Sequence, residues 1–292
     1  NVSLQDEAEL KRSAAAQGLI VMGPDCGTAI IGGVGVGFAN AARRGPIGVI
    51  GASGTGIQEV TCLVDGFGSG VSHAIGTGSR DLSDAVGGIS SLQAINALEA
   101  DPETRVIVLI SKPAGPDTLS KINARLVRCT KPVVACVLGA AVADQPDIEK
   151  VVVVGNLEDA ARSAVNLSGS SLPDDDGDVA SVSEERGRLA AGQRFVRGVF
   201  AGGTLCLQAQ QLMRSLGIPV HSNEPLDPAM KLADSAVSQG HSMIDLGADE
   251  FTVGRPHPMI DSTLRAQRLE AEGQDPEVAV ILLDIILGYG AS

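Results

Sequence analysis

The sequence has little aromatic material: no tryptophan, one tyrosine (Tyr289) and five phenylalanines among 292 residues. Its core must therefore be packed from Val, Ile, Leu and Ala, and a hydrophobic share of 44% is enough for that. These aliphatic residues are typical of the buried strands of a parallel sheet. The 36 glycines indicate many tight turns. The length favours about two domains.

Positive charge is also scarce, because 22 basic residues face 35 acidic ones and the formal net charge is −13. A chain this acidic repels phosphate backbones and anionic lipids, so we expect neither nucleic acid nor membrane as a partner. No apolar run approaches the roughly 20 residues that span a bilayer. No signal peptide opens the sequence either. We predict a cytoplasmic protein.

Motifs for metals, disulfides and ATP are missing as well. The five cysteines show no CxxC spacing and form an odd set, which favours small buried thiols in a reducing cytosol. No cluster has metal-ligand spacing, so no metal is expected. No Gly-Lys-Ser/Thr loop indicates a nucleotide site.

Both ends of the sequence suggest a fragment, or a chain completed by something else. It begins with a helical pattern that no strand precedes, and it stops directly after the apolar run "ILLDIILGYGAS". A parallel strand needs cover on both faces, and no further helix follows here to provide it.

The first half alternates strand-like and helical patterns with short connections, which predicts a doubly wound parallel α/β sheet. The expected strands are 19–22, 47–50, 71–75, 106–110, 132–138 and 151–154, and the expected helices are 5–17, 56–64, 90–99, 118–129 and 157–166.

After an acidic segment, "SGSSLPDDDGDVASVSEERG", which we interpret as a linker or a mobile surface loop, the alternation begins again. The expected strands are 195–200, 218–221, 242–246 and 278–287, and the expected helices are 204–216, 228–239 and 262–271.

The two halves repeat each other in detail. "SGT" (Ser53–Thr55) and "GGT" (Gly202–Thr204) each follow a strand directly, and "DPETRVIVLI" is matched later by "DPEVAVILLD". Order and rough spacing agree, so we predict two related domains in tandem.

The repeated turns are candidate anion sites. The first N–H groups of a helix lack intrahelical partners and carry partial positive charge. Small residues let an anion approach those donors, and a Thr hydroxyl adds one more. We predict phosphate or carboxylate binding at two turns, Ser53, Gly54, Thr55 and Gly56 in one and Gly202, Gly203 and Thr204 in the other. If the domains pack about a pseudo-twofold axis, the N-termini of both helices point at the same anion and bind it together. The alternative is that any tight strand-to-helix turn favours Gly and Thr.

Charged residues near these turns have two interpretations each. Glu59 is either a favourable acid near a helix start or a functional residue, which acts as a catalytic base or orients a substrate amine. Arg80 lies past a strand end, where ligands of open parallel sheets collect, so it either holds a substrate carboxylate or forms a surface ion pair.

A Pro-rigid loop, "GRPHPMID", carries Arg255, His257 and Asp261. His257 either donates a proton to a leaving phosphate or braces the loop. Arg255 is a second candidate for the substrate carboxylate, and Asp261 is expected to be the N-cap of the following helix.

Three further residues are interpreted mainly as structural or exposed residues. His73 lies inside an apolar strand and reads as a core histidine. Lys112 follows a strand, where it either meets an anion or is simply exposed. Cys26 in "GPDCG" reads as a packed thiol, because no base accompanies it.

The sequence resembles the FdrA family, which is related to succinyl-CoA synthetase and the NDP-forming acyl-CoA synthetases. The resemblance rests on "GPDCGTAI", "GPIGVIGASGTGIQEV", "IGTGSRDLS", "VIVLISKP", "DEFTVGRPHPMID" and "VAVILLDIILGYG" and covers most of the chain. It implies two flavodoxin-like domains.

The resemblance implies the following organisation. Residues 1–45 are the tail of a missing N-terminal CoA-binding-type domain, 46–167 the first flavodoxin-like domain, 168–192 the acidic linker, and 193–292 a second such domain, incomplete at its C-terminus. In the synthetases, a Glu matching Glu59 contacts a phosphohistidine in a GHAGA motif. Here "GAAVADQPD" stands after Leu138, without histidine.

The resemblance therefore implies carbamoyl transfer between carbamoyl phosphate and oxamate, with a phosphate ester and a small carboxylate as substrates. One alternative is an acyl-CoA ligase, and only that function involves CoA or a nucleotide as cofactor. The other is a non-catalytic assembly or regulatory subunit. In each case we expect other subunits, in a hetero-oligomer or a homodimer.

Overall fold

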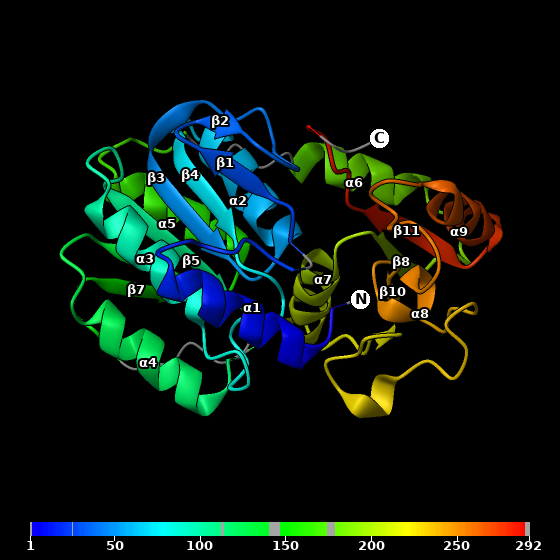
Figure 1. The fold of residues 1–292 in the computed structure, drawn as a ribbon. Coiled ribbons are helices and arrows are strands. Elements are labelled where there is room, and N and C mark those ends of the chain that lie inside the picture. Colours follow the sequence, from blue (N-terminus) through cyan, green and yellow to red (C-terminus); the bar gives the residue numbers. More distant parts are fainter. Residues whose placement is uncertain (1, 25, 112–113, 140–146, 174–178, 290–292) are drawn as a thin grey trace. The chain divides into compact units, whose positions relative to one another are not determined.

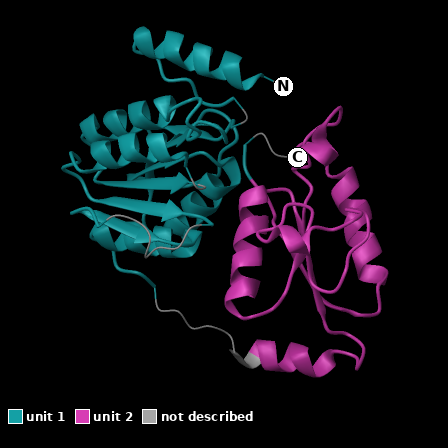
Figure 2. Ribbon diagram, turned by 90° about the horizontal axis from the view of Figure 1, so that it is seen from below, with its two compact units in different colours: residues 1–173, 288–290 teal, residues 174–287, 291–292 magenta. Residues whose placement is uncertain are grey.

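A computed structural model describes residues 2–24, 26–111, 114–139, 147–173 and 179–289. The chain forms two compact units, residues 1–173 with 288–290 and residues 174–287 with 291–292 (Figure 2). The domain boundaries expected from the sequence stay a prediction, and each unit is described by itself.

Unit 1 is built on a sheet in the order β2-β1-β4-β3-β5-β6-β7 (Figure 1). All pairs from β4 to β7 are parallel, and β1 pairs antiparallel with β4 and β2. Taken in chain order, the five parallel strands have the flavodoxin-like order 2-1-3-4-5. The strands are β1 (Ala29–Ile31), β2 (Val34–Gly35), β3 (Arg44–Gly51), β4 (Val71–Gly76), β5 (Val106–Ser111), β6 (Val133–Val137) and β7 (Val151–Val154).

Helices cover both faces of this sheet, as Figure 2 shows. The central strand β5 has all six residues buried, as expected for a parallel strand covered on both sides. Its core is aliphatic, in agreement with the composition. The helices of unit 1 are α1 (Leu4–Ala16), α2 (Gly54–Gly66), α3 (Ile89–Ala100), α4 (Pro116–Leu126) and α5 (Leu157–Leu167).

Two residues near the end of the sequence, Gly288 and Tyr289, belong to unit 1. Tyr289 forms an antiparallel bridge with Ala39, in which the Tyr289 N–H donates to the Ala39 carbonyl at 2.8 Å and the Ala39 N–H donates back at 3.2 Å. Gly288 has a φ of +139°, and a Cβ there would lie 2.2 Å from the Ala39 oxygen. Glycine is therefore required for this close approach.

Unit 2 has a four-stranded, fully parallel sheet in the order β11-β8-β10-β9. α7 packs on one side with Phe200 and Met243, while α9 packs on the other with Val199 and Ile244. The strands are β8 (Phe195–Phe200), β9 (His221–Ser222), β10 (Ser242–Asp245) and β11 (Val278–Leu283), and the helices are α6 (Val179–Arg188), α7 (Gly203–Ser215), α8 (Asp249–Thr252) and α9 (Thr263–Gln274).

The α/β class predicted from the sequence is confirmed, and three element predictions are wrong. Residues 19–22 form no strand, and Leu19 is 57% exposed outside the sheet. The helix expected over 228–239 is reduced to a 3-10 turn, Pro228–Met230, because Leu232 is drawn into the core and donates its N–H to Ser222. The acidic segment contains α6. Among the described helices, none is both long and apolar enough to cross a membrane.

Candidate functional site

The sheet of unit 1 has its topological switch point between β3 and β5, because the chain leaves β3 toward β4 on one side and later returns to place β5 on the other. In open parallel sheets, ligands bind outside the carboxyl ends of the strands at such a point. Here the end of β3 leads through Ala52 and Ser53 into α2, and β5 ends at Ser111. The Ala52 N–H donates to the Ile110 carbonyl at 3.2 Å, so the two strand ends lie side by side.

The start of α2 confirms the predicted strand–turn–helix geometry. Ser53 is the N-cap, with φ −121° and ψ 122°, and its hydroxyl accepts from the Gly56 N–H at 3.2 Å. The hydroxyls of Ser53 and Thr55 are 3.5 Å apart. The 13-residue helix directs its N-terminal partial charge at the switch point.

The "GPDCG" loop reaches the same turn. A Cβ on Gly54 would lie 2.8 Å from the Thr28 hydroxyl oxygen and 3.5 Å from the Cys26 sulfur. A Cβ on Gly76, at the end of β4, would lie only 2.2 Å from the same sulfur. Both glycines are therefore required by the approach of this loop. Thr28 adds a hydroxyl beside the start of α2, and the sequence analysis did not identify it.

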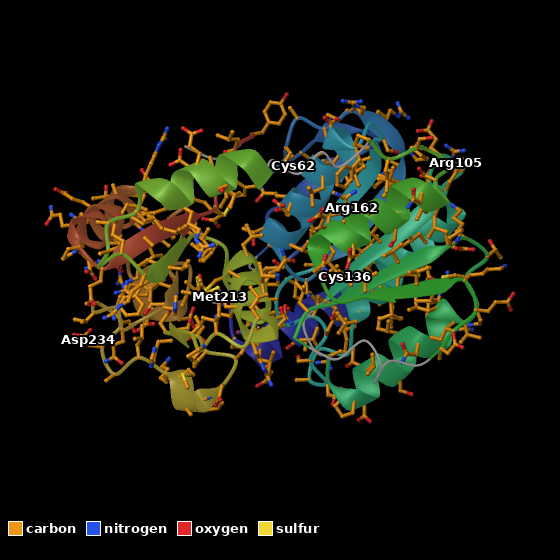
Figure 3. All side chains as sticks on the ribbon, turned by 180° about the vertical axis from the view of Figure 1, so that it is seen from behind. Cys62, Arg105, Cys136, Arg162, Met213 and Asp234 are labelled. Carbon is orange, nitrogen blue, oxygen red and sulfur yellow. The ribbon has the colours of Figure 1, made fainter. Side chains whose placement is uncertain are left out.

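Two neighbouring residues in the second turn of α2 differ in burial. Glu59 is half-buried. Gln58 is 95% buried, and its side-chain oxygen has no hydrogen-bond partner among the described residues. Glu59 also contributes, after burial, to raising the pKa of the Cys62 thiol one turn further along. Cys62 is exposed on α2, whereas Cys136 is buried in β6 (Figure 3).

The start of α7 in unit 2 repeats the backbone of α2. Gly202 is the N-cap, with φ −109° and ψ 110°, and the helix again has 13 residues. The surroundings differ, however. The carboxylate of Asp284 accepts from the Ala201 N–H at 2.9 Å and from the Gly202 N–H at 2.8 Å. A Cβ on Gly203 would lie 2.4 Å from a carboxylate oxygen of Asp245.

Two buried carboxylates therefore face the start of α7, and one of them already accepts from the backbone of the turn. Arg265 lies 3.3 Å from Asp284 and offsets part of this negative charge. An incoming anion at the start of α7 therefore meets electrostatic repulsion from these carboxylates. The two-sided clamp predicted from the sequence stays a prediction.

Arg80 and Asp81 belong to a buried ion cluster that anchors α1. Lys11, with no exposed side-chain surface, donates to Glu7 at 2.9 Å, to Asp81 at 2.8 Å and to the Thr77 carbonyl at 2.7 Å. Arg80 pairs with Glu7 at 2.8 Å and donates to a backbone carbonyl of the N-terminal segment. Asp81 also accepts from the first N–H groups of α3. Of the two interpretations of Arg80, the ion pair is therefore the one that its contacts show.

The loop before α9 holds the other predicted residues. The ring Nδ1 of His257 accepts from the Met259 N–H at 3.2 Å, and a Cβ on Gly247 would lie 2.8 Å from its Nε2. Arg255 is exposed. Ser262 is the N-cap of α9, one residue later than expected, and the Asp261 carboxylate accepts from the Thr263 N–H at 3.0 Å.

Some of the residues considered in the sequence lie away from the start of α2, and others are outside the described residues. His73 is at the opposite end of β4, where its Nε2 lies 3.5 Å from Asp101 and its Nδ1 accepts from the Gly32 N–H. Lys112 and the 140–146 part of "GAAVADQPD" are outside the described residues. No group of three His, Cys, Asp or Glu side chains that could hold a metal occurs in the described part of the chain.

The segments of this chain match two domain models. Residues 42–128 match the CoA binding domain and residues 199–292 match CoA-ligase. One match lies in each half of the chain.

The chain is also similar to particular known proteins. Over its full length the chain is 46% identical to the uncharacterized protein YahF of Escherichia coli K12, of which it spans 57%. It is 26% identical to the ADP-forming sulfoacetate-CoA ligase subunit SauD of Bilophila wadsworthia, covering 64% of each protein. It is 28% identical to the alpha subunit of the ADP-forming succinate–CoA ligase of Methanothermobacter thermautotrophicus, covering 48% of this chain and 47% of that one. The dinucleotide-forming acetyl-coenzyme A synthetase 1 of Ca. Korarchaeum cryptofilum is similar at 16% identity and a TM-score of 0.40, over 76% of this chain and 49% of that one.

Proposed function

We propose that the chain is part of an acyl-CoA ligase of the NDP-forming type, which joins a carboxylic acid to CoA through a phosphoryl intermediate. The observation that carries this proposal is the start of α2 at the switch point of unit 1, where the N-terminus of a 13-residue helix lies beside the hydroxyls of Ser53, Thr55 and Thr28. The two domain matches support it, because they cover both halves of the chain.

In this proposal the turn Ser53–Gly56 binds the phosphoryl group, and the Thr28 hydroxyl donates to it from the neighbouring loop. Positive partial charge at the helix start stabilises the oxygens as charge shifts onto them during transfer. Because residues 139–147 contain no histidine, the substrate carboxylate would accept the phosphoryl group with release of the nucleoside diphosphate, and the CoA thiol would then displace phosphate from the acyl phosphate. Glu59, one turn into α2, acts as the base for the thiol proton or orients the carboxylate. The nucleotide, CoA and further subunits are the implied cofactors and partners.

Unit 2 has the weaker anion site of the two. Gly202, Gly203 and Thr204 contribute to binding only if the charge of Asp245 and Asp284 is balanced, for example by a divalent cation that accompanies a nucleotide. His257 and Arg255 remain candidates for proton donation and for carboxylate binding.

A measurement of anion binding tests the central step. The backbone amide resonances of Gly54, Thr55 and Gly56 should shift on titration of the full chain with inorganic phosphate, and those at the start of α7 should shift much less. The double variant Ser53→Ala with Thr55→Val should weaken phosphate binding by about tenfold, because two hydroxyl contacts to a charged group are lost.

Ser262→Ala is the matched control, since Ser262 is also an N-cap and makes no side-chain cap hydrogen bond. It should leave the phosphate affinity unchanged. Equal shifts at both helix starts, or unchanged affinity in the double variant, would contradict the assignment to α2.

The reaction is tested with the full chain, its partner subunits, ATP or GTP, CoA and a panel of carboxylic acids, with thioester formation as the readout. Carbamoyl transfer is tested in parallel with carbamoyl phosphate and oxamate, with phosphate release as the readout. The domain matches favour thioester formation over carbamoyl transfer. If carbamoyl phosphate and oxamate accelerate phosphate release and no thioester forms, carbamoyl transfer is favoured over the ligase reaction.

A further inference from the structure

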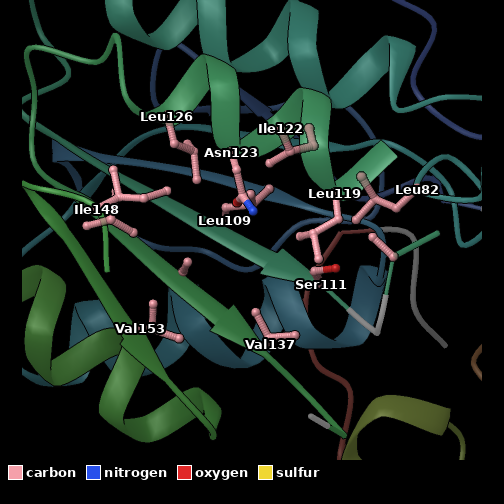
Figure 4. Close-up of a pocket in the computed structure, with 13 residues that line it drawn as sticks. Leu82, Leu109, Ser111, Leu119, Ile122, Asn123, Leu126, Val137, Ile148 and Val153 are labelled. Atoms are coloured by element: carbon pink, nitrogen blue, oxygen red, sulfur yellow. The ribbon is translucent and has the colours of Figure 1, made fainter. Parts of the chain in front are cut away.

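Unit 1 contains a cavity of about 100 Å³ beneath α4, on the face of the sheet opposite α2 and α5 (Figure 4). Strands β5, β6 and β7 form its floor through Leu109, Ala135 and Val153. Helix α4 forms its roof through Leu119, Ile122 and Leu126. The lining is therefore almost entirely aliphatic.

The sequence explains how this space arises. Side chains alternate between the two faces of a strand, so Val133, Ala135 and Val137 of β6 face α4, while Val134 and Cys136 face the other way. The residue at the middle of this row is alanine, the smallest side chain there. Helix α4 presents its apolar residues at positions i, i+3 and i+7, which form one stripe above the alanine. The gap lies between that stripe and the strands.

A polar residue interrupts the apolar stripe of α4. Asn123 lies one residue after Ile122, and its side chain points from the helix toward Leu109 and the strands in Figure 4. It is half-buried and lines the cavity. An amide that faces an apolar cavity offers one acceptor and two donors to a ligand.

One end of the cavity reaches the proposed reaction site. Ser111 lines the cavity and is the last residue of β5. The residue before it accepts from the Ala52 N–H, directly before the Ser53 turn of α2. The cavity and the start of α2 therefore meet at the same edge of the sheet, at the switch point.

We propose that this cavity binds the apolar tail of the carboxylic acid substrate, and that the substrate class is a short aliphatic monocarboxylic acid. The part concerning the reacting carboxylate rests on the proposed function, because it places that group near Ser111 and the α2 turn.

The size of the cavity limits the tail. A cavity of about 150 Å³ in another protein accommodates benzene, which has six carbon atoms, so about 100 Å³ corresponds to about four carbon atoms. Each methylene group buried up to that number should tighten binding about fourfold. A dicarboxylic acid of the same length would have to bury its second charge among aliphatic side chains and is rejected.

Binding of neutral probes tests the cavity without any catalysis. The methyl resonances of Leu119 and Ile122 should shift when the full chain is titrated with alcohols. Affinity should rise about fourfold per carbon from ethanol to 1-butanol and then level off. Ala135→Leu, which adds three carbons inside the cavity, should weaken 1-butanol binding at least tenfold.

Val152→Leu is the matched control, because this residue of β7 faces away from the cavity and is 40% exposed. Ala135→Val, which adds two carbons inside the cavity, provides a second way to fill the space if Ala135→Leu fails to fold. An absence of methyl shifts in the wild-type protein, or equal 1-butanol affinity in a folded cavity-filling variant, would overturn the proposal.

Substrate selection is tested separately with butanoate and succinate. Butanoate should bind at least tenfold more tightly than succinate and compete with 1-butanol. If succinate binds as well as butanoate, the proposed substrate class is wrong. Failure to form a thioester with any acid would instead overturn the ligase proposal, because alcohol binding does not depend on the reaction.

Discussion

Replacement of Lys11 by methionine should destabilise unit 1 strongly. The ammonium group is fully buried and makes three hydrogen bonds, to Glu7, to Asp81 and to the Thr77 carbonyl, all at 2.7–2.9 Å. Methionine fills a similar volume and can make none of them. Glu7 and Asp81, which are 1% and 0% exposed, would then have only Arg80 to balance two negative charges.

Removing one partner of a buried ion pair costs about 3–5 kcal/mol. We expect the lower end, about 3 kcal/mol, because both carboxylates keep other partners: Arg80 stays with Glu7, and Asp81 still accepts from the Ser90 and Ser91 N–H groups. Glu7→Gln in the Lys11→Met background should recover at least 1 kcal/mol, because it restores the balance of charge.

The free energy of unfolding from urea titration of the full chain, with hydrogen exchange to locate the change in α1 and α3, is the appropriate assay. Lys121→Met, on the exposed side of α4, should change stability by less than about 0.5 kcal/mol. If Lys11→Met costs less than about 1 kcal/mol, the cluster does not hold α1, and this reasoning is refuted.

Three other outcomes are expected. Gly66→Ala, at the last position of α2 with nothing within 4 Å of a new Cβ, should raise the free energy of unfolding by about 0.5–1 kcal/mol in thermal or urea denaturation. Maleimide should modify Cys62 and leave Cys136 intact at pH 8 by mass spectrometry, because Cys62 is exposed and burial raises the pKa of Cys136 to about 12. Hydrogen bonds from Thr104 and the charge of His73 hold the pKa of Asp101 below its usual value against the opposing effect of burial, so its stabilising contribution is present above about pH 4 and lost as the pH falls below that. Asp101→Asn should therefore destabilise the protein at pH 7, and a urea titration at pH 3 should find a smaller difference.

The local repeats were predictable because they are encoded by adjacent residues. Asp101 follows α3 and its carboxylate accepts from the N–H groups of residues 103 and 104; Asp275 follows α9 and accepts from residue 277. In both halves the next element is a parallel strand, which is fully buried in β5 but partly exposed in β11, an edge strand. Likewise Ser53 and Gly202 have nearly the same backbone angles and start helices of equal length. Short-range chemistry of this kind can be read from the sequence.

The contacts that could not be predicted from the sequence depend on which strands become neighbours in the sheet. Asp284 reaches the start of α7 only because β11 pairs with β8, and nothing near either strand indicates that pairing. Thr28 reaches α2 through a loop that crosses the end of β4. The missed hairpin of β1 and β2 is short and glycine-rich, so it lacks the alternating pattern that identifies a strand.

The bridge between Ala39 and Tyr289 has a practical consequence for dissecting this protein. A fragment cut after Pro173 would contain nearly all of unit 1, yet it would lose the strand partner of residue 39 and the aromatic ring that lies against Gly35. Truncation at the linker would therefore leave the N–H and C=O groups of Ala39 without the partners that Tyr289 supplies.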